Sequence, residues 1–228
     1  MDDRITPEQF QGADGTGDWR SLGPAYALFR TGTFQAGARL VARIAEVADE
    51  LGRHPDVDLR GGTVTVRLGS HEVGGLSARD VELARRISAA AAGMGVEADP
   101  SGVQQTQLGV DALAGGRVQP FWRALLGYDE RPGEEAVREE EAAPSLVDPR
   151  GRGLDVWFPR GDSPRTEHNR LHLDVFVPDD VAQERVEAAL AAGGHLVTDR
   201  WAPSWWVLAD PEGNEAAVCT WQEPPLEV

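Results

Sequence analysis

Two periodic patterns of apolar residues alternate along the first hundred positions. Residues 35–52 carry apolar side chains at three- and four-residue intervals with charged residues between them, which predicts an amphipathic helix ending at a glycine. A second helix is predicted over residues 77–92, because Ser77 and Asp80 form a capping pattern ahead of a similar repeat. Residues 25–30 and the alternating run at 61–68 predict strands. The first half is therefore expected to combine helices with an antiparallel sheet.

The second half follows a different pattern. Residues 93–102 gather glycine, proline and serine without a sustained period, so we expect a first domain over 1–98 and a second over 103–228. Strands are predicted near residues 105–110, 153–158, 170–177, 205–210 and 215–221, and helices near 117–126 and 181–192. Two strand-helix-strand units in succession indicate a duplicated module. The acidic segment 129–148, with eight acids and two arginines, is interpreted as a solvated loop.

Composition narrows the chemistry. The 228 residues include 22 basic and 38 acidic side chains, a net charge of −16, which disfavours a nucleic-acid partner. Every basic residue is arginine, so lysine Schiff bases and Walker-type phosphate loops are excluded. A single cysteine, Cys219, cannot form an internal disulfide. The sequence shows neither a membrane span nor a leader, and we therefore expect no membrane partner and a cytoplasmic location.

Two histidines of the first half occupy the ends of predicted elements. His54 follows the first helix and His71 follows the strand over 61–68, where side chains can face a cleft. Because imidazole gains and loses protons near neutral pH, two converging histidines could serve as acid and base. In the alternative interpretation, His54 fills a turn before Pro55 and His71 satisfies backbone groups near a helix start.

Residues 19–92 contain the run "SHEVGGLSARDVELARRI". They also contain an acidic residue, a histidine-proline pair, a later histidine and an aspartate, which are Asp49, His54, Pro55, His71 and Asp80. Through these residues the segment resembles the pterin-4a-carbinolamine dehydratase family. Two positions depart from the family pattern. Arg53 stands where a first histidine belongs, and Gly61 stands where an aromatic residue would fall.

The resemblance implies a lyase that removes water from a 4a-hydroxytetrahydropterin, such as a tetrahydrobiopterin, to give a quinonoid dihydropterin. It implies that His54 and His71 are catalytic, and that Asp49, Arg53, Pro55, Ser70 and Glu72 bind substrate. Arg53 cannot act as a base, so weakened or altered activity is expected. Asp80 is explained by helix capping alone, and we prefer that interpretation.

Residues 104–221 contain the motifs "RLHLDV" and "DPEGNE". Through these motifs the segment resembles the vicinal-oxygen-chelate superfamily, the fold of glyoxalases, bleomycin-resistance proteins and extradiol dioxygenases. The resemblance implies paired βαβββ units that form a cup. His172 matches a metal ligand of some relatives, but Ala217 stands where their final glutamate belongs. We expect a pocket lined by Gln107, Trp157, His172, Trp205 and Glu215. Gln107, His172 and Glu215 are weak metal candidates, and a divalent metal is not favoured because a single histidine suits tight binding poorly.

The sequence thus predicts an α+β fusion of an antiparallel-sheet dehydratase-like domain, with helices on one face, and a glyoxalase-like domain. Three functions stay open: a pterin dehydratase, a metal-dependent lyase or dioxygenase in the second cup, and a non-catalytic small-molecule binder. The expected partners are a small molecule, with a pterin as one candidate, and further copies of the chain in a homo-oligomer. No certain cofactor is expected.

Overall fold

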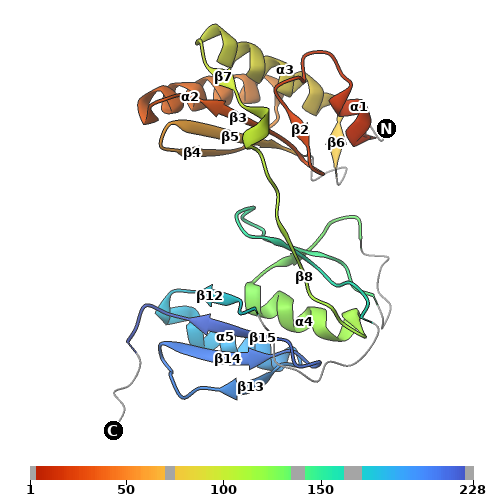
Figure 1. Ribbon diagram of the computed structural model, residues 1–228, viewed down its shortest axis with the longest axis vertical. Helices are drawn as coiled ribbons and strands as arrows, with labels where there is room; N and C mark the ends of the chain where they lie inside the picture. Colours follow the sequence, from red (N-terminus) through yellow and green to blue (C-terminus); the bar gives the residue numbers. More distant parts are fainter. Residues whose placement is uncertain (1–3, 70–74, 135–141, 162–170, 224–228) are drawn as a thin grey trace. The chain divides into compact units, whose positions relative to one another are not determined.

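A computed structural model describes residues 4–69, 75–134, 142–161 and 171–223 of the chain. The chain divides into two compact units, residues 1–105 and 106–228. Figure 1 draws the elements of both units. Each unit has its own hydrophobic core.

The first unit is built on an antiparallel sheet in the order β2-β3-β5-β4, with β7 pairing beside β3. A short pair, β1 with β6, lies outside that sheet. The elements are β1 Arg4–Ile5, α1 Pro7–Gln11, β2 Arg20–Ser21, β3 Ala25–Arg30, α2 Phe34–Leu51, β4 Asp56–Arg60, β5 Thr63–Leu68, β6 Leu76–Ser77, α3 Ala78–Gly93, β7 Glu97–Ala98 and the short helix η1 Pro100–Gly102.

The alternation of side chains along each strand decides which face of this sheet is buried. Ala25, Ala27 and Phe29 of β3 are fully buried, and on β5 so are Val64 and Val66. These residues join the apolar sides of α2 and α3 in one core cluster, so both helices cover the same sheet face (Figure 1). The intervening side chains of β3, β5 and β4 form the opposite, polar face, as the two-residue period of a strand requires.

Local signals fix the helix ends. The Thr33 side chain accepts a hydrogen bond from the backbone N–H of Ala36 at 3.1 Å and caps the start of α2. Gly52 ends that helix in the left-handed conformation, at φ 60° and ψ 35°. At α3, Asp80 accepts from the backbone N–H and the hydroxyl of Ser77 at 2.7 and 2.8 Å, which confirms the capping interpretation of Asp80.

The second unit contains the two βαβββ modules that the sequence predicted. The first module has the sheet order β8-β11-β10-β9 and the second the order β12-β15-β14-β13, so in each the first strand lies parallel beside the last. The elements are β8 Gln107–Gly109, α4 Gly115–Leu126, β9 Asp129–Glu130, β10 Leu146–Val147, β11 Asp155–Trp157, β12 Asp174–Phe176, α5 Asp179–Ala191, β13 His195–Thr198, β14 Trp205–Ala209 and β15 Glu215–Cys219.

The turn between β14 and β15 joins the two modules. Asp210 is fully buried and accepts a hydrogen bond from the Trp122 indole of α4 at 2.9 Å. Glu212 accepts from the backbone N–H groups of Leu113 and Ala114, just before α4, at 2.7 and 2.9 Å. The DPEGN motif is therefore a structural tie within the second unit.

Several elements of both units were not predicted, among them β1, α1, β2 and β7 of the first unit. The acidic segment 129–148, interpreted as a solvated loop, carries β9 and β10 in its described parts, and Leu146 is fully buried opposite Val156. Strands β4 and β13 were also missed. No helix in the described ranges combines the length and apolar character needed to cross a membrane.

Candidate functional site

The predicted catalytic residue His54 lies just beyond the end of α2. The turn at Gly52 brings the backbone N–H of Arg53 to the carbonyl of Ala48 at 3.0 Å, so the chain folds back over the last helical turn. His54 Nε2 then lies 3.3 Å from Asp49 Oδ1. Both side chains are largely exposed, at 75% for His54 and 78% for Asp49. The imidazole is thus accessible to a ligand from solution.

Asp49 defines which nitrogen of His54 is available. An ionised carboxylate only accepts hydrogen bonds, so Nε2 must carry the proton in this contact. Nδ1 is then the nitrogen that can exchange a proton with a ligand. The contact between His54 and Asp49 joins two positions five residues apart at the end of α2.

The register of β4 and β5 relates His54 to the segment that contains His71. Asp56 pairs with Arg67 in an antiparallel ladder, and continuing that register sets position 54 opposite position 69. Position 69 is the last described residue before the segment 70–74. Ser70, His71 and Glu72, which the sequence predicted as site residues, lie outside the described residues. The described chain after β5 therefore ends at the same end of the sheet as His54.

A polar row crosses the sheet at this end. Tyr26, Arg67 and Asp56 are cross-strand neighbours on β3, β5 and β4. Arg67 donates to Asp56 Oδ2 at 2.6 Å. Burial works to lower the pKa of the Arg67 guanidinium, but the hydrogen bond to Asp56 and the proximity of Tyr26 outweigh it and raise that pKa above its ordinary value. A fixed positive charge thus lies beside the His54 end of the sheet, and the sequence analysis missed it.

Gly61, at the family's aromatic position, has a structural explanation here. It lies in the turn between β4 and β5 with φ 53°, a conformation that side chains other than glycine adopt at a cost. This turn is at the opposite end of β4 from His54. Pro55 lies between His54 and β4 and is half-buried, which fixes the backbone where the chain leaves the helix.

The second unit distributes its five predicted pocket residues over two sheets. Gln107 pairs with Asp155 across β8 and β11, and Trp157 on β11 is opposite Gly109. In the other sheet, Asp174 pairs with Ala217, and continuing this register sets His172 opposite Glu215. Trp205 pairs with Cys219 at the far end of β14.

Strand pairing brings some of the predicted pocket residues together and separates others. His172 and Glu215 occupy one cross-strand row, whereas Trp205 and Glu215 are separated by four residues of register, roughly 13 Å along the strands. Among the described residues, no group of three or more His, Cys, Asp or Glu side chains could hold a metal ion. Ala217, at the usual ligand position, has no side-chain donor for a metal. The candidates Gln107, His172 and Glu215 therefore do not fit a resident divalent metal.

The two units match different families of known proteins. Residues 4–90 match the family model "Pterin 4 alpha carbinolamine dehydratase" and residues 107–219 match "Glyoxalase-like domain". A Nocardia farcinica protein, described as "Putative pterin-4-alpha-carbinolamine dehydratase", is 44% identical over 71 residues, which cover 31% of this chain and 75% of the relative. A Mycobacterium tuberculosis protein with the same description is 40% identical over 87 residues, covering 37% of this chain and 93% of the relative.

Two solved structures are similar to parts of the chain. A glyoxalase/bleomycin resistance protein/dioxygenase family enzyme from Burkholderia phytofirmans is 17% identical with a TM-score of 0.41, covering 52% of this chain and 98% of that chain. A transcriptional coactivator/pterin dehydratase from Brucella melitensis is 25% identical with a TM-score of 0.35, covering 39% and 98%. Through its first unit the chain belongs to the pterin-4a-carbinolamine dehydratase family, and its second unit matches the glyoxalase-like domain.

Proposed function

We propose that the first unit is a lyase that dehydrates a 4a-hydroxytetrahydropterin, with His54 and His71 as the catalytic pair. The observation that carries this proposal is the accessible imidazole of His54, held by Asp49 at the sheet end where the chain leaves β5 toward His71. Family membership supports the reaction class, since curated relatives are described as dehydratases of this type.

The reaction needs two proton transfers and no oxidant. The bond between the ring carbon and its hydroxyl oxygen breaks, and the hydroxyl takes up a proton and leaves as water. The neighbouring ring N–H loses its proton, and its electron pair forms the new carbon–nitrogen double bond. His54 accepts that proton at Nδ1, because Nε2 already donates to Asp49. His71 then supplies the proton to the leaving hydroxyl.

Arg53 and Asp49 support this chemistry without exchanging protons. The guanidinium of Arg53 stays charged, so it is assigned to binding a substrate carbonyl oxygen rather than to base catalysis. Asp49 orients His54, and its contact at 3.3 Å is exposed, which limits its contribution. Pro55, Ser70 and Glu72 complete the proposed substrate-binding set around the two histidines.

The second unit is proposed to bind a small molecule through Gln107, Trp157, His172, Trp205 and Glu215, within a homo-oligomer in the cytoplasm. A non-catalytic binder is the alternative function, because Arg53 replaces a histidine of the family pattern. Turnover separates these two functions, since a binder would hold the pterin without releasing water.

The test is the rate of carbinolamine dehydration by the purified full chain. We expect His54→Ala and His71→Ala each to slow turnover by about 10²- to 10⁴-fold, the usual contribution of a positioned acid or base. His195→Ala is the matched control, because this exposed histidine lies on β13 of the second unit. Equal rates for the wild type and both site variants would refute the assignment, and binding without turnover would favour the alternative.

A further inference from the structure

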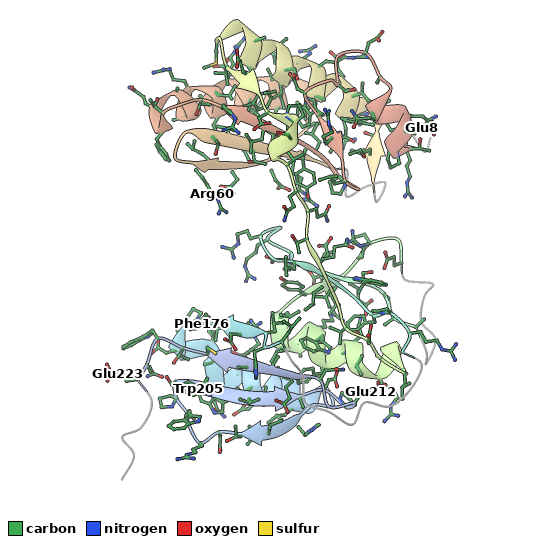
Figure 2. The ribbon with its side chains drawn as sticks, viewed as in Figure 1. Glu8, Arg60, Phe176, Trp205, Glu212 and Glu223 are labelled. Carbon is green, nitrogen blue, oxygen red and sulfur yellow. The ribbon has the colours of Figure 1, made fainter. Side chains whose placement is uncertain are left out.

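One face of the second sheet carries an aromatic row. Trp205 on β14, Cys219 on β15 and Phe176 on β12 are consecutive cross-strand neighbours, so their side chains leave the sheet on the same side. Neighbours of opposite parity, such as Val218 and Leu208, belong to the core beneath the sheet. Phe176 is 74% exposed although it is a large apolar residue. Figure 2 shows Trp205 and Phe176 on their separate strands of this sheet.

The dimensions of this row suit a flat ring. Two strand spacings separate β14 from β12, about 9 to 10 Å. A planar ring stacked between two aromatic side chains needs about 7 Å between their planes, twice the usual carbon contact distance. The floor residues Ala217 and Cys219 on β15 are small and buried, at 6% and 7% exposed. The separation of the two outer strands exceeds the spacing that one stacked ring needs.

Trp205 is held in place by its neighbours. Its ring stacks on Trp201 with centroids 5.5 Å apart and an interplanar angle of 27°. The guanidinium of Arg200 lies over the Trp201 ring, 4.7 Å from its centroid. A side chain braced in this way loses little conformational entropy when a ligand stacks on its remaining surface.

One carboxylate adjoins the row. Asp174 lies on β12 two residues before Phe176, on the same face, and its cross-strand partner is the floor residue Ala217. Asp174 is exposed. Burial, and after it the charge of Asp174, raises the pKa of the neighbouring Cys219 thiol. A carboxylate accepts two parallel hydrogen bonds from a ligand edge that bears adjacent N–H groups.

We propose that the second unit binds a flat heteroaromatic ring with two adjacent N–H donors, stacked between Trp205 and Phe176 and hydrogen-bonded to Asp174. The 2-amino-4-oxopyrimidine edge of a pterin has this donor pair. The inference rests on the proposed small-molecule role of the second unit and narrows its ligand class. The proposed site includes Asp174, Phe176 and Cys219, which the sequence did not predict. Of the residues that form its walls and floor, only Trp205 was predicted.

The probes are unsubstituted pterin and lumazine, which has a carbonyl in place of the 2-amino group. Calorimetric titration of the full chain measures affinity, and protection of Cys219 from iodoacetamide locates the ligand, because Cys219 is the only cysteine of the chain. We expect pterin to bind and to slow alkylation, and lumazine to bind at least tenfold more weakly.

Variants test each contact separately. Asp174→Asn should weaken pterin binding at the second unit by about ten- to hundredfold, since the charged pair of acceptor oxygens is lost. Trp205→Ala should weaken it by about tenfold through lost stacking. Glu184→Gln is the matched control, an exposed acid on α5 outside the row.

Failure of this binding proposal can be distinguished from failure of the proposed dehydratase function. His54→Ala should slow turnover by about 10²- to 10⁴-fold and leave pterin protection of Cys219 unchanged, so either proposal can fail alone. Unchanged pterin binding and Cys219 protection in Asp174→Asn and Trp205→Ala would overturn the inference. It would also be overturned if pterin gave no protection and Phe176→Ala converted a dimer to a monomer in sedimentation, because the row would then be a contact between copies.

Discussion

Replacing Asp210 with alanine should destabilise the second unit selectively. The carboxylate is fully buried and accepts four hydrogen bonds, from the Trp122 indole, the Asn214 amide side chain and the backbone N–H groups of Glu212 and Asn214, at 2.8 to 2.9 Å. Alanine leaves these donors without an acceptor, and the indole of Trp122 cannot reach water because the residue is 3% exposed.

The expected loss is about 3 to 5 kcal/mol of unfolding free energy, the usual cost of breaking a buried charged network by removing one partner. With a urea m-value of about 2 kcal/mol per M, the unfolding midpoint should fall by roughly 2 M. Asp210→Asn keeps the shape and part of the bonding, and should lose less.

Tryptophan fluorescence during urea unfolding measures this effect, because six of the seven tryptophans lie in the second half of the chain. Asp111→Ala, an exposed acid of the same unit, is the control. Dehydration turnover at low urea should be unchanged, since the first unit has its own core. A midpoint shift for Asp210→Ala no larger than that of Asp111→Ala would refute the reasoning.

Three further predictions follow from individual contacts. Asp80→Ala removes the acceptor that binds Ser77 and should cost the first unit about 1 to 2 kcal/mol in thermal unfolding, whereas an unchanged melting temperature would contradict the capping role. Burial works to raise the pKa of Asp148, but hydrogen bonds from three backbone N–H groups outweigh it and lower that pKa. Its stabilising charge is therefore present above about pH 4 and lost as pH falls through the lowered pKa, so urea titrations should show that Asp148→Asn destabilises at pH 7 and less below pH 4. Burial and then Asp174 raise the pKa of Cys219, so Asp174→Asn should speed iodoacetamide alkylation at pH 8 roughly two- to threefold, and an unchanged rate would place Asp174 away from the thiol.

Long periodic segments were predictable because the pattern itself encodes burial. The helix predicted over residues 35–52 is Phe34–Leu51, and the Ser77 and Asp80 pattern caps α3 as expected. Both signals depend on residues that are close in sequence, so no tertiary information is needed.

Short strands were missed because composition hides them. Strand β4 spans five residues and is separated from the end of α2 by four residues, and its Val57 and Leu59 alternate with charged residues. The segment 129–148 is strongly acidic on average, yet Leu146 is buried by pairing with Val156. A two-residue strand has no periodicity of its own, and only its partner strand stabilises it.

The candidate sites likewise combine parts that the sequence could predict with parts that depend on strand pairing. Placing His54 at a helix end required only the helix pattern, but relating it to the chain beyond β5 required the β4–β5 register. The aromatic row of Trp205, Cys219 and Phe176 depends on pairing between residues up to 43 positions apart, which alternation within one strand cannot define.

The most direct test of the account is a double-mutant cycle on dehydration of a 4a-hydroxytetrahydropterin by the full chain. Initial rates are measured for the wild type, His54→Ala, His71→Ala and the double variant. If the two histidines act as one acid–base pair, each single variant should lose most of the activity and the double variant should be little slower than either. Wild-type turnover at the uncatalysed rate, or single variants as fast as the wild type, would contradict the central claim.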